Sequence, residues 1–202
     1  MIRTRKQDVA PEVFTETPKA EVHQWTASRI QEMRSCLDNP EYFIKHYLFT
    51  PNKTQENLIR SFNQERVVMR AVDRGVGTTS AGLAYVLWQS LFNFDKASIV
   101  VAQSHMTLTD MNKKLREMLN TLPQWMQMPL TYMRRDYLEF DNGSRIRFEV
   151  ASGHTARGCS YNLMFIDNAF CIGDPNADYL RTVIMPMAAV SSASKVFHIV
   201  AK

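Results

Sequence analysis

Apolar and polar positions along the chain predict short strands that alternate with helices. Runs of five or six β-branched or apolar residues predict strands at 67–72, 97–102, 162–167 and 196–200. Apolar residues at helical spacing predict helices at 21–37, 42–47, 54–62, 79–92 and 107–122, and a partly helical stretch at 178–190. Such alternation is typical of an α/β fold, with a mainly parallel sheet, right-handed crossovers and helices on both faces.

Three further patterns divide the chain. Residues 1–20 contain prolines and no periodicity, so they predict a flexible N-terminal arm. Residues 21–62 predict a helical segment, and 63–202 predict the core domain. Within that core, the runs 137–140 and 145–150 flank an Asn-Gly pair, which supplies the positive φ angles of a tight β-hairpin.

Composition narrows the class of protein. The chain is 45% hydrophobic and 22% charged, which excludes a wholly disordered chain. Its longest apolar run, 183–190, is shorter than the roughly 18 residues that span a membrane, and no secretory signal opens the chain. An odd number of cysteines (Cys36, Cys159 and Cys171) without Cys-x-x-Cys spacing favours a reducing, intracellular compartment.

Charge leaves two interpretations open. The net charge of +4 permits an anionic partner without requiring one. Basic residues gather around the predicted hairpin, at Arg134, Arg135, Arg145, Arg147 and Arg157. They form either a solvated hairpin face or a surface for DNA or phosphate.

The loop after the first predicted core strand has the context of a phosphate-binding loop. A strand, two glycines, hydroxyl residues and a helix follow in order, and a helix N-terminus suits phosphate. The pattern Gly-x-x-x-x-Gly-Lys-Ser/Thr is incomplete. With Gly77 as its second glycine and Thr79 as its hydroxyl, Val72 stands at the first glycine and Thr78 at the lysine. A tight turn, with Thr79 only capping the helix, explains the same residues.

The strand predicted at 162–167 ends in Asp167, as does a Walker B strand whose aspartate holds Mg²⁺. ATPases of this type place a glutamate next, and this chain has Asn168. An amide cannot accept a proton, so the general base is missing. Taken alone, Asp167 is equally a turn or capping residue, and Asn168 as a weak Mg²⁺ ligand is a further hypothesis.

From about residue 39 onward, the ordered motifs resemble the ATPase domain of the large terminase subunit of tailed phages, the DNA-packaging motor, of the myovirus type. The matching segments are 39–43, 54–55, 72–79, 138–146, 157–158 and 163–170. The resemblance implies a P-loop NTPase-like fold of the ASCE/RecA type, with a mainly parallel sheet flanked by helices, a β-hairpin insertion and an N-terminal helical arm.

The resemblance also implies roles for single residues. Gln55 stands at the family's adenine-contacting position, and the loop Arg74, Gly75, Val76, Gly77, Thr78 and Thr79 would cradle phosphate with its backbone. The Thr79 hydroxyl and Asp167 would hold Mg²⁺, while Arg74 would partly replace the missing lysine. The alternatives are an exposed helix residue for Gln55 and a solvated loop charge for Arg74.

Departures from the family set the functional expectation. Thr78 and Asn168 replace the two catalytic positions, and the family continues beyond this point with a second ATPase subdomain and a nuclease domain. We expect ATP and Mg²⁺ to be bound weakly or lost, and hydrolysis to be impaired in the isolated chain unless a neighbouring subunit completes the site.

Three hypotheses remain. They are a terminase-like ATPase module of a phage or prophage packaging machine, a pseudo-ATPase that binds the motor, portal or DNA without ATP, and an unrelated α/β nucleotide-binding enzyme. The family implies other terminase subunits, the portal protein and double-stranded DNA as partners, an oligomer, no membrane, and the cytoplasm of a bacterial host.

Overall fold

A seven-stranded mixed sheet forms the centre of the molecule in a computed structural model that describes residues 26–152, 154–156, 160–169 and 194–201. Its strands in spatial order are β1 (Val67–Val72), β7 (Lys195–Ala201), β6 (Leu163–Asp167), β2 (Ala97–Ala102), β5 (Arg145–Val150), β4 (Tyr137–Phe140) and β3 (Leu130–Met133). The first five strands in this order are parallel, and the β5–β4–β3 pairings are antiparallel. The α/β fold expected from the sequence is confirmed.

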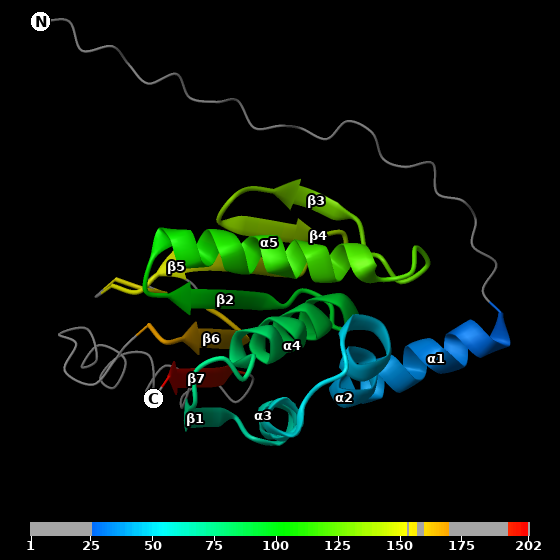
Figure 1. Ribbon diagram of the computed structural model, residues 1–202. Coiled ribbons are helices and arrows are strands. Elements are labelled where there is room, and N and C mark those ends of the chain that lie inside the picture. Colours follow the sequence, from blue (N-terminus) through cyan, green and yellow to red (C-terminus); the bar gives the residue numbers. More distant parts are fainter. Residues whose placement is uncertain (1–25, 153, 157–159, 170–193, 202) are drawn as a thin grey trace, which may run out of the picture.

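Two helices of the described residues, α4 (Thr78–Phe92) and α5 (His105–Thr121), lie over one face of this sheet (Figure 1). The others are α1 (Ala27–Asp38), α2 (Pro40–Phe43), the π-helix η1 (Ile44–Leu48) and α3 (Lys53–Gln64). The α2 segment meets the end of α4, where the Phe43 and Phe92 rings lie 5.1 Å apart edge to face. Within the described residues, no helix combines the length and apolar character needed to cross a bilayer.

Most element boundaries agree with the sequence patterns to within two residues. Strand β3 was not predicted; it pairs with β4 through an irregular register, and its short run has no clear alternation. The second predicted helix, 42–47, is divided into α2 and η1. The predicted arm at 1–20 and the helical stretch at 178–190 lie outside the described residues, and the division into three segments stays a prediction.

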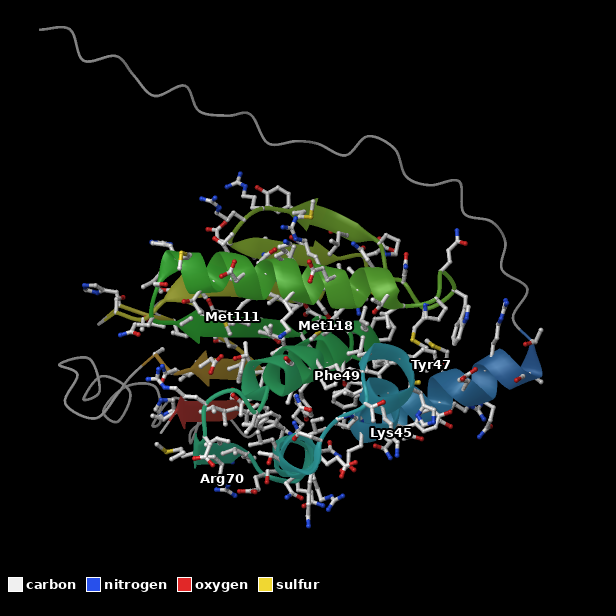
Figure 2. The ribbon with its side chains drawn as sticks, in the orientation of Figure 1. Lys45, Tyr47, Phe49, Arg70, Met111 and Met118 are labelled. Atoms are coloured by element: carbon white, nitrogen blue, oxygen red, sulfur yellow. The ribbon has the colours of Figure 1, made fainter. Side chains whose placement is uncertain are left out.

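A dense core between helices and sheet fixes the height of α4 above the strands. Met111 and Met118 of α5 are buried in this core, as expected of methionines that fill it (Figure 2). At Gly82, a Cβ atom would lie 2.1 Å from Cζ of Phe165 in β6, well inside van der Waals contact. The absence of a side chain at this position therefore lets α4 lie directly on the strand that ends at Asp167.

Lys195 ties the start of β7 to the end of α3. Its Nζ donates hydrogen bonds to the carbonyls of Phe62 (2.8 Å) and Asn63 (2.9 Å) and to the Tyr85 hydroxyl (3.1 Å). Burial lowers the pKa of Lys195, because the ammonium loses water. The three acceptors replace that water, and two of them are helix-end carbonyls that otherwise lack partners.

Replacing Lys195 by methionine should lower the free energy of unfolding by about 2 kcal/mol, because it removes the donor to the carbonyls of buried Phe62 and exposed Asn63 and to the Tyr85 hydroxyl. Urea denaturation measures this change. Lys113→Met is the matched control, since Lys113 is exposed on α5 in an i,i+4 pair with Glu117 and should change stability by under about 0.5 kcal/mol. Equal effects of the two substitutions would contradict a structural role for Lys195.

Candidate nucleotide site

A cavity of about 280 Å³ lies at the carboxyl ends of the parallel strands, where ligands bind in open α/β sheets. It is lined by Val72, Asp73, Arg74, Gly75, Thr78, Thr79, Gln103, Thr107, Asp167, Asn168 and Ile199. The loop after β1 forms one wall, and the ends of β6 and β7 form another. The volume is slightly below the roughly 300–1,000 Å³ typical of small-molecule sites, so it suits a phosphate chain better than a whole nucleotide.

The loop between β1 and α4 adopts a conformation that requires glycine. Gly75 and Gly77 have φ angles of +82° and +80°, in the left-handed region. Gly77 is also the N-cap of α4, and no side chain caps the helix there. The N–H groups of the first turn of α4 are therefore left for an anion, as the phosphate-loop hypothesis expects.

Thr79 and Asp167 come together across this cavity from positions 88 residues apart. The Thr79 hydroxyl donates a hydrogen bond of 2.5 Å to Oδ2 of Asp167. Since Gly77 is the N-cap, the alternative in which Thr79 only caps α4 is wrong. The sequence placed these two residues at a shared site, and the structure does bring them together.

Burial raises the pKa of Asp167, and the Thr79 hydrogen bond and the charge of Lys114 oppose that shift. A desolvated carboxylate is stabilised by a cation placed against it. Hydroxyl and carboxylate oxygens are also the ligands that Mg²⁺ prefers. The pair formed by Thr79 and Asp167 therefore fits a magnesium ion.

Positive charge approaches the cavity from two sides. Arg74 lines it, and Thr78 offers no charge at the position of the P-loop lysine. Lys114 acts on the Asp167 carboxylate from α5, two turns beyond Thr107, which also lines the cavity. Neither Lys114 nor Thr107 was singled out from the sequence, because they belong to no motif and reach the site only through the packing of α5.

Gln55 lies behind the loop. Its side chain is 8% exposed, so the alternative of an exposed helix residue is wrong. Its Nε2 donates to the carbonyl of Gly77 at 2.9 Å, and its Oε1 accepts from the N–H of Asn52 at 2.9 Å. It is not among the residues that line the cavity, and the adenine contact implied by the family stays a prediction.

Asn168 follows Asp167 at the cavity wall with a φ angle of +50°. Its N–H donates to the carbonyl of Ile199 at 2.8 Å, which fixes the turn out of β6. Asparagine tolerates this left-handed conformation better than most side chains. The left-handed backbone at residue 168 therefore favours asparagine on conformational grounds, whatever the loss of a general base means for catalysis.

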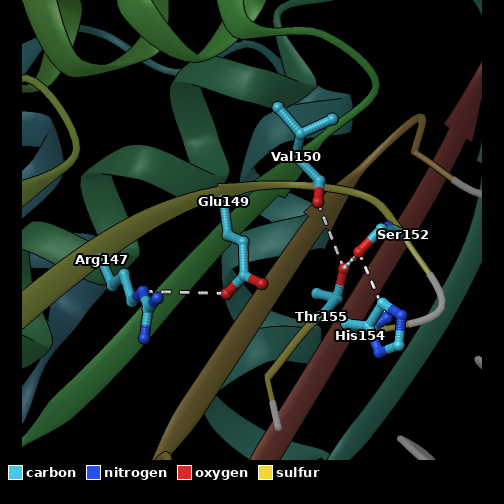
Figure 3. A network of polar contacts seen from close by, with 6 residues as sticks. All are labelled: Arg147, Glu149, Val150, Ser152, His154 and Thr155. Atoms are coloured by element: carbon cyan, nitrogen blue, oxygen red, sulfur yellow. Dashed lines mark hydrogen bonds and ion pairs between the residues drawn. The ribbon is translucent and has the colours of Figure 1, made fainter.

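The surface of the hairpin carries charges of both signs, because glutamates lie beside two of its arginines. Arg145 and Arg147 are exposed on β5, with Glu139 opposite Arg145 and an Arg147–Glu149 ion pair at 3.8 Å (Figure 3). Arg134 lies 5.1 Å from the centre of the Tyr132 ring. Arg135 is exposed, and its carbonyl accepts a hydrogen bond from Asn112.

Arg157 lies outside the described residues, as does residue 153, but contacts among Val150, Ser152 and Thr155 in the turn before it are described. In this turn Thr155 Oγ1 accepts from the N–H of Ser152 at 2.8 Å and donates to the carbonyl of Val150 at 3.2 Å (Figure 3). The turn follows β5 at the same end of the parallel strands as the cavity. Whether the hairpin and this turn contact DNA stays a prediction.

Fold and site together define a P-loop NTPase-like α/β protein, with a glycine-containing loop before a helix and a carboxylate at the end of a neighbouring strand. No family model matches the sequence. Solved structures do share the fold, as the resemblance from the motifs implied.

The shared fold is that of phage large terminase ATPase domains. A mutant ATPase domain of the Thermus phage P74-26 large terminase matches with a TM-score of 0.64 at 15% identity, over 78% of this chain and 68% of that one. The unmutated domain matches with a TM-score of 0.58 at 14% identity, over 78% and 67%. The HK97 bacteriophage large terminase matches with a TM-score of 0.65 at 14% identity, over 81% of this chain and 37% of that protein. The chain therefore spans little more than a third of the HK97 protein.

Proposed function

We propose that this chain is a terminase large-subunit-like ATPase module of a phage or prophage DNA-packaging machine, which binds ATP with Mg²⁺ and hydrolyses it poorly on its own. The observation that carries the proposal is the Thr79–Asp167 pair, joined at 2.5 Å in the lining of a cavity whose other wall includes a glycine-containing loop. A fold shared with terminase ATPase domains supports it.

The chain's own groups account for binding. The uncapped N–H groups at the start of α4 would bind the phosphate anion, and Arg74 and Lys114 add positive charge near that position. Thr79 and Asp167 would hold Mg²⁺, which supplies neutralisation of the phosphate charge when bound. Hydrolysis lacks two parts, since Thr78 brings no cation to the phosphates and Asn168 cannot take a proton from water.

Calorimetric titration of the purified chain with ATP, with and without Mg²⁺, tests this proposal. We expect micromolar binding that weakens at least about tenfold without Mg²⁺, because Asp167 then repels the phosphates. No heat of binding at millimolar ATP would overturn the proposal and favour the alternative function.

Restoring the two missing groups should restore part of the chemistry. Thr78→Lys is expected to tighten ATP binding about tenfold, and Thr78→Lys with Asn168→Glu should raise hydrolysis above either single variant by about 10²–10⁴. The glutamate must adopt the φ angle of +50° seen at Asn168, which costs about 1 kcal/mol. Phosphate release measures the rate, and Thr78→Met, which adds length without charge, is the control.

The alternative is a pseudo-ATPase that binds the motor, portal or DNA without ATP. The joint replacement of the P-loop lysine and the Walker B glutamate favours it, because hydrolysis then has neither group. Under either function the proposed partners are other terminase subunits, the portal protein and double-stranded DNA, in the cytoplasm of a bacterial host.

A further inference from the structure

Two amide side chains hold the phosphate loop from behind. Asn52, the N-cap of α3, donates from Nδ2 to the carbonyl of Val76 at 3.0 Å. Gln55, in the first turn of the same helix, donates from Nε2 to the carbonyl of Gly77 at 2.9 Å. We call these two residues the amide clamp. They bind consecutive loop carbonyls, so the loop N–H groups are turned away from α3.

The opposite ends of the same amides cap α3. Oδ1 of Asn52 accepts from the N–H of Gln55 at 3.0 Å, and Oε1 of Gln55 accepts from the N–H of Asn52 at 2.9 Å. Such a reciprocal capping box requires only acceptors, and serine or threonine with glutamate are its usual members. Asparagine and glutamine carry donors as well. One pair of side chains therefore both starts α3 and holds the loop.

Packing leaves little room for another arrangement. A Cβ atom at Gly77 would lie 2.5 Å from Nε2 of Gln55, so this position of the Gln55 amide requires a glycine at residue 77. The Gly77 carbonyl also accepts the first helical hydrogen bond of α4, from Ala81 at 3.2 Å. Gln55 thus binds the atom at which α4 begins, which is where the uncapped N–H groups gather.

We propose that Asn52 and Gln55 are positioning residues of the phosphate site: they hold the loop carbonyls so that the loop N–H groups are preset for a phosphate chain, whatever base it carries. This inference rests on the phosphate binding proposed above. It differs from an adenine contact by Gln55, because both amide ends of Gln55 already have partners on α3 and the loop.

The test uses uncharged variants of the full chain. Asn52→Ser keeps an N-cap acceptor but removes the donor to Val76, and Gln55→Met removes the donor to Gly77. Asn39→Ser is the matched control, since Asn39 caps α2, through the N–H of Tyr42, rather than α3. The ligands are inorganic triphosphate and ATP, each with Mg²⁺, measured by calorimetry.

Both clamp variants should weaken inorganic triphosphate and ATP by the same factor, about tenfold, which corresponds to the loss of one hydrogen bond of about 1.4 kcal/mol. Asn39→Ser should bind as the wild type does. If Gln55→Met weakens ATP alone and leaves triphosphate unchanged, Gln55 contacts the base and this inference is overturned. Wild-type protein that binds neither ligand would instead overturn the proposed function.

Hydrogen exchange of the ligand-free protein gives a readout that needs no binding. The amide of Ala81, which donates to the Gly77 carbonyl, should exchange at least about tenfold faster in Asn52→Ser and Gln55→Met than in Asn39→Ser, because the start of α4 loses its anchors. Wild-type exchange rates in both clamp variants would overturn the inference, even where the variants bind phosphate less tightly.

Discussion

Replacing Gly82 by alanine is expected to lower the free energy of unfolding by about 1–2 kcal/mol, although alanine is the better helix former. Helix propensity alone would stabilise α4 by about 1 kcal/mol. The added Cβ would lie 2.1 Å from Phe165, whose ring is fully buried. Overpacking a close-packed core costs about 1–3 kcal/mol, so the clash outweighs the propensity. Urea denaturation followed by circular dichroism measures the result.

A second substitution separates the clash from other effects. Phe165→Leu removes the ring that the new Cβ would meet, so Gly82→Ala should cost about 2 kcal/mol less in a Phe165→Leu background than in the wild type. Additive effects of the two substitutions would contradict direct contact between these positions. Phe165 lies two residues before Asp167, so the displacement of Phe165 by Gly82→Ala should also weaken ATP binding.

Asp167→Asn should stabilise the protein while it removes the dependence of ATP binding on Mg²⁺. Burial raises the pKa of Asp167, so the folded state holds the proton more tightly than the unfolded state does. Above that raised pKa the buried carboxylate is ionised, and its desolvation lowers the free energy of unfolding. The neutral amide of Asp167→Asn avoids this cost and should raise the free energy of unfolding at pH 7 by on the order of 1 kcal/mol. The gain should disappear as the pH falls through that pKa, because the carboxyl is then neutral as well.

The same variant should weaken ATP binding in the presence of Mg²⁺ by about tenfold, because it loses the gain in affinity that Mg²⁺ gives the wild type. Denaturation at pH 7 and pH 4, with calorimetry in the presence and absence of Mg²⁺, checks both signs. Asp110→Asn on the exposed side of α5 controls for the change in net charge. A destabilised Asp167→Asn variant at pH 7 would show that the carboxylate holds the fold rather than the ligand.

Sequence patterns predicted the strands of the sheet well because the buried runs are apolar and bounded. β2 is buried along its whole length, and its predicted limits match the observed ones. β3 was missed because Leu130, Thr131 and Tyr132 are only partly buried or exposed, so no alternation marks them. Tertiary pairing with β4, rather than local preference, makes this segment a strand.

The candidate site was predicted where it follows a motif and missed where it follows packing. Thr79 lies at the start of a recognisable helix and Asp167 at the end of a recognisable strand. Six of the predicted residues line the cavity: Arg74, Gly75, Thr78, Thr79, Asp167 and Asn168. Asn52, Gln103, Thr107 and Lys114 were not predicted, since their relation to the cavity depends on how α3 and α5 are placed. An amide at an N-cap, followed three residues later by glutamine, was the one local signal of the clamp.

The position of β7 between β1 and β6 determines when the site can form during synthesis. Within the described sheet β1 pairs only with β7, so the strand that carries the phosphate loop has no neighbour until residues 195–201 have left the ribosome. Strand β7 separates β1 from β6 and so sets the distance between the two walls of the cavity. It is synthesised more than 120 residues after β1. Long-range pairing of this kind folds slowly. Nascent chains that end before β7 should therefore have a first strand without its neighbour and should lack the cavity at the strand ends.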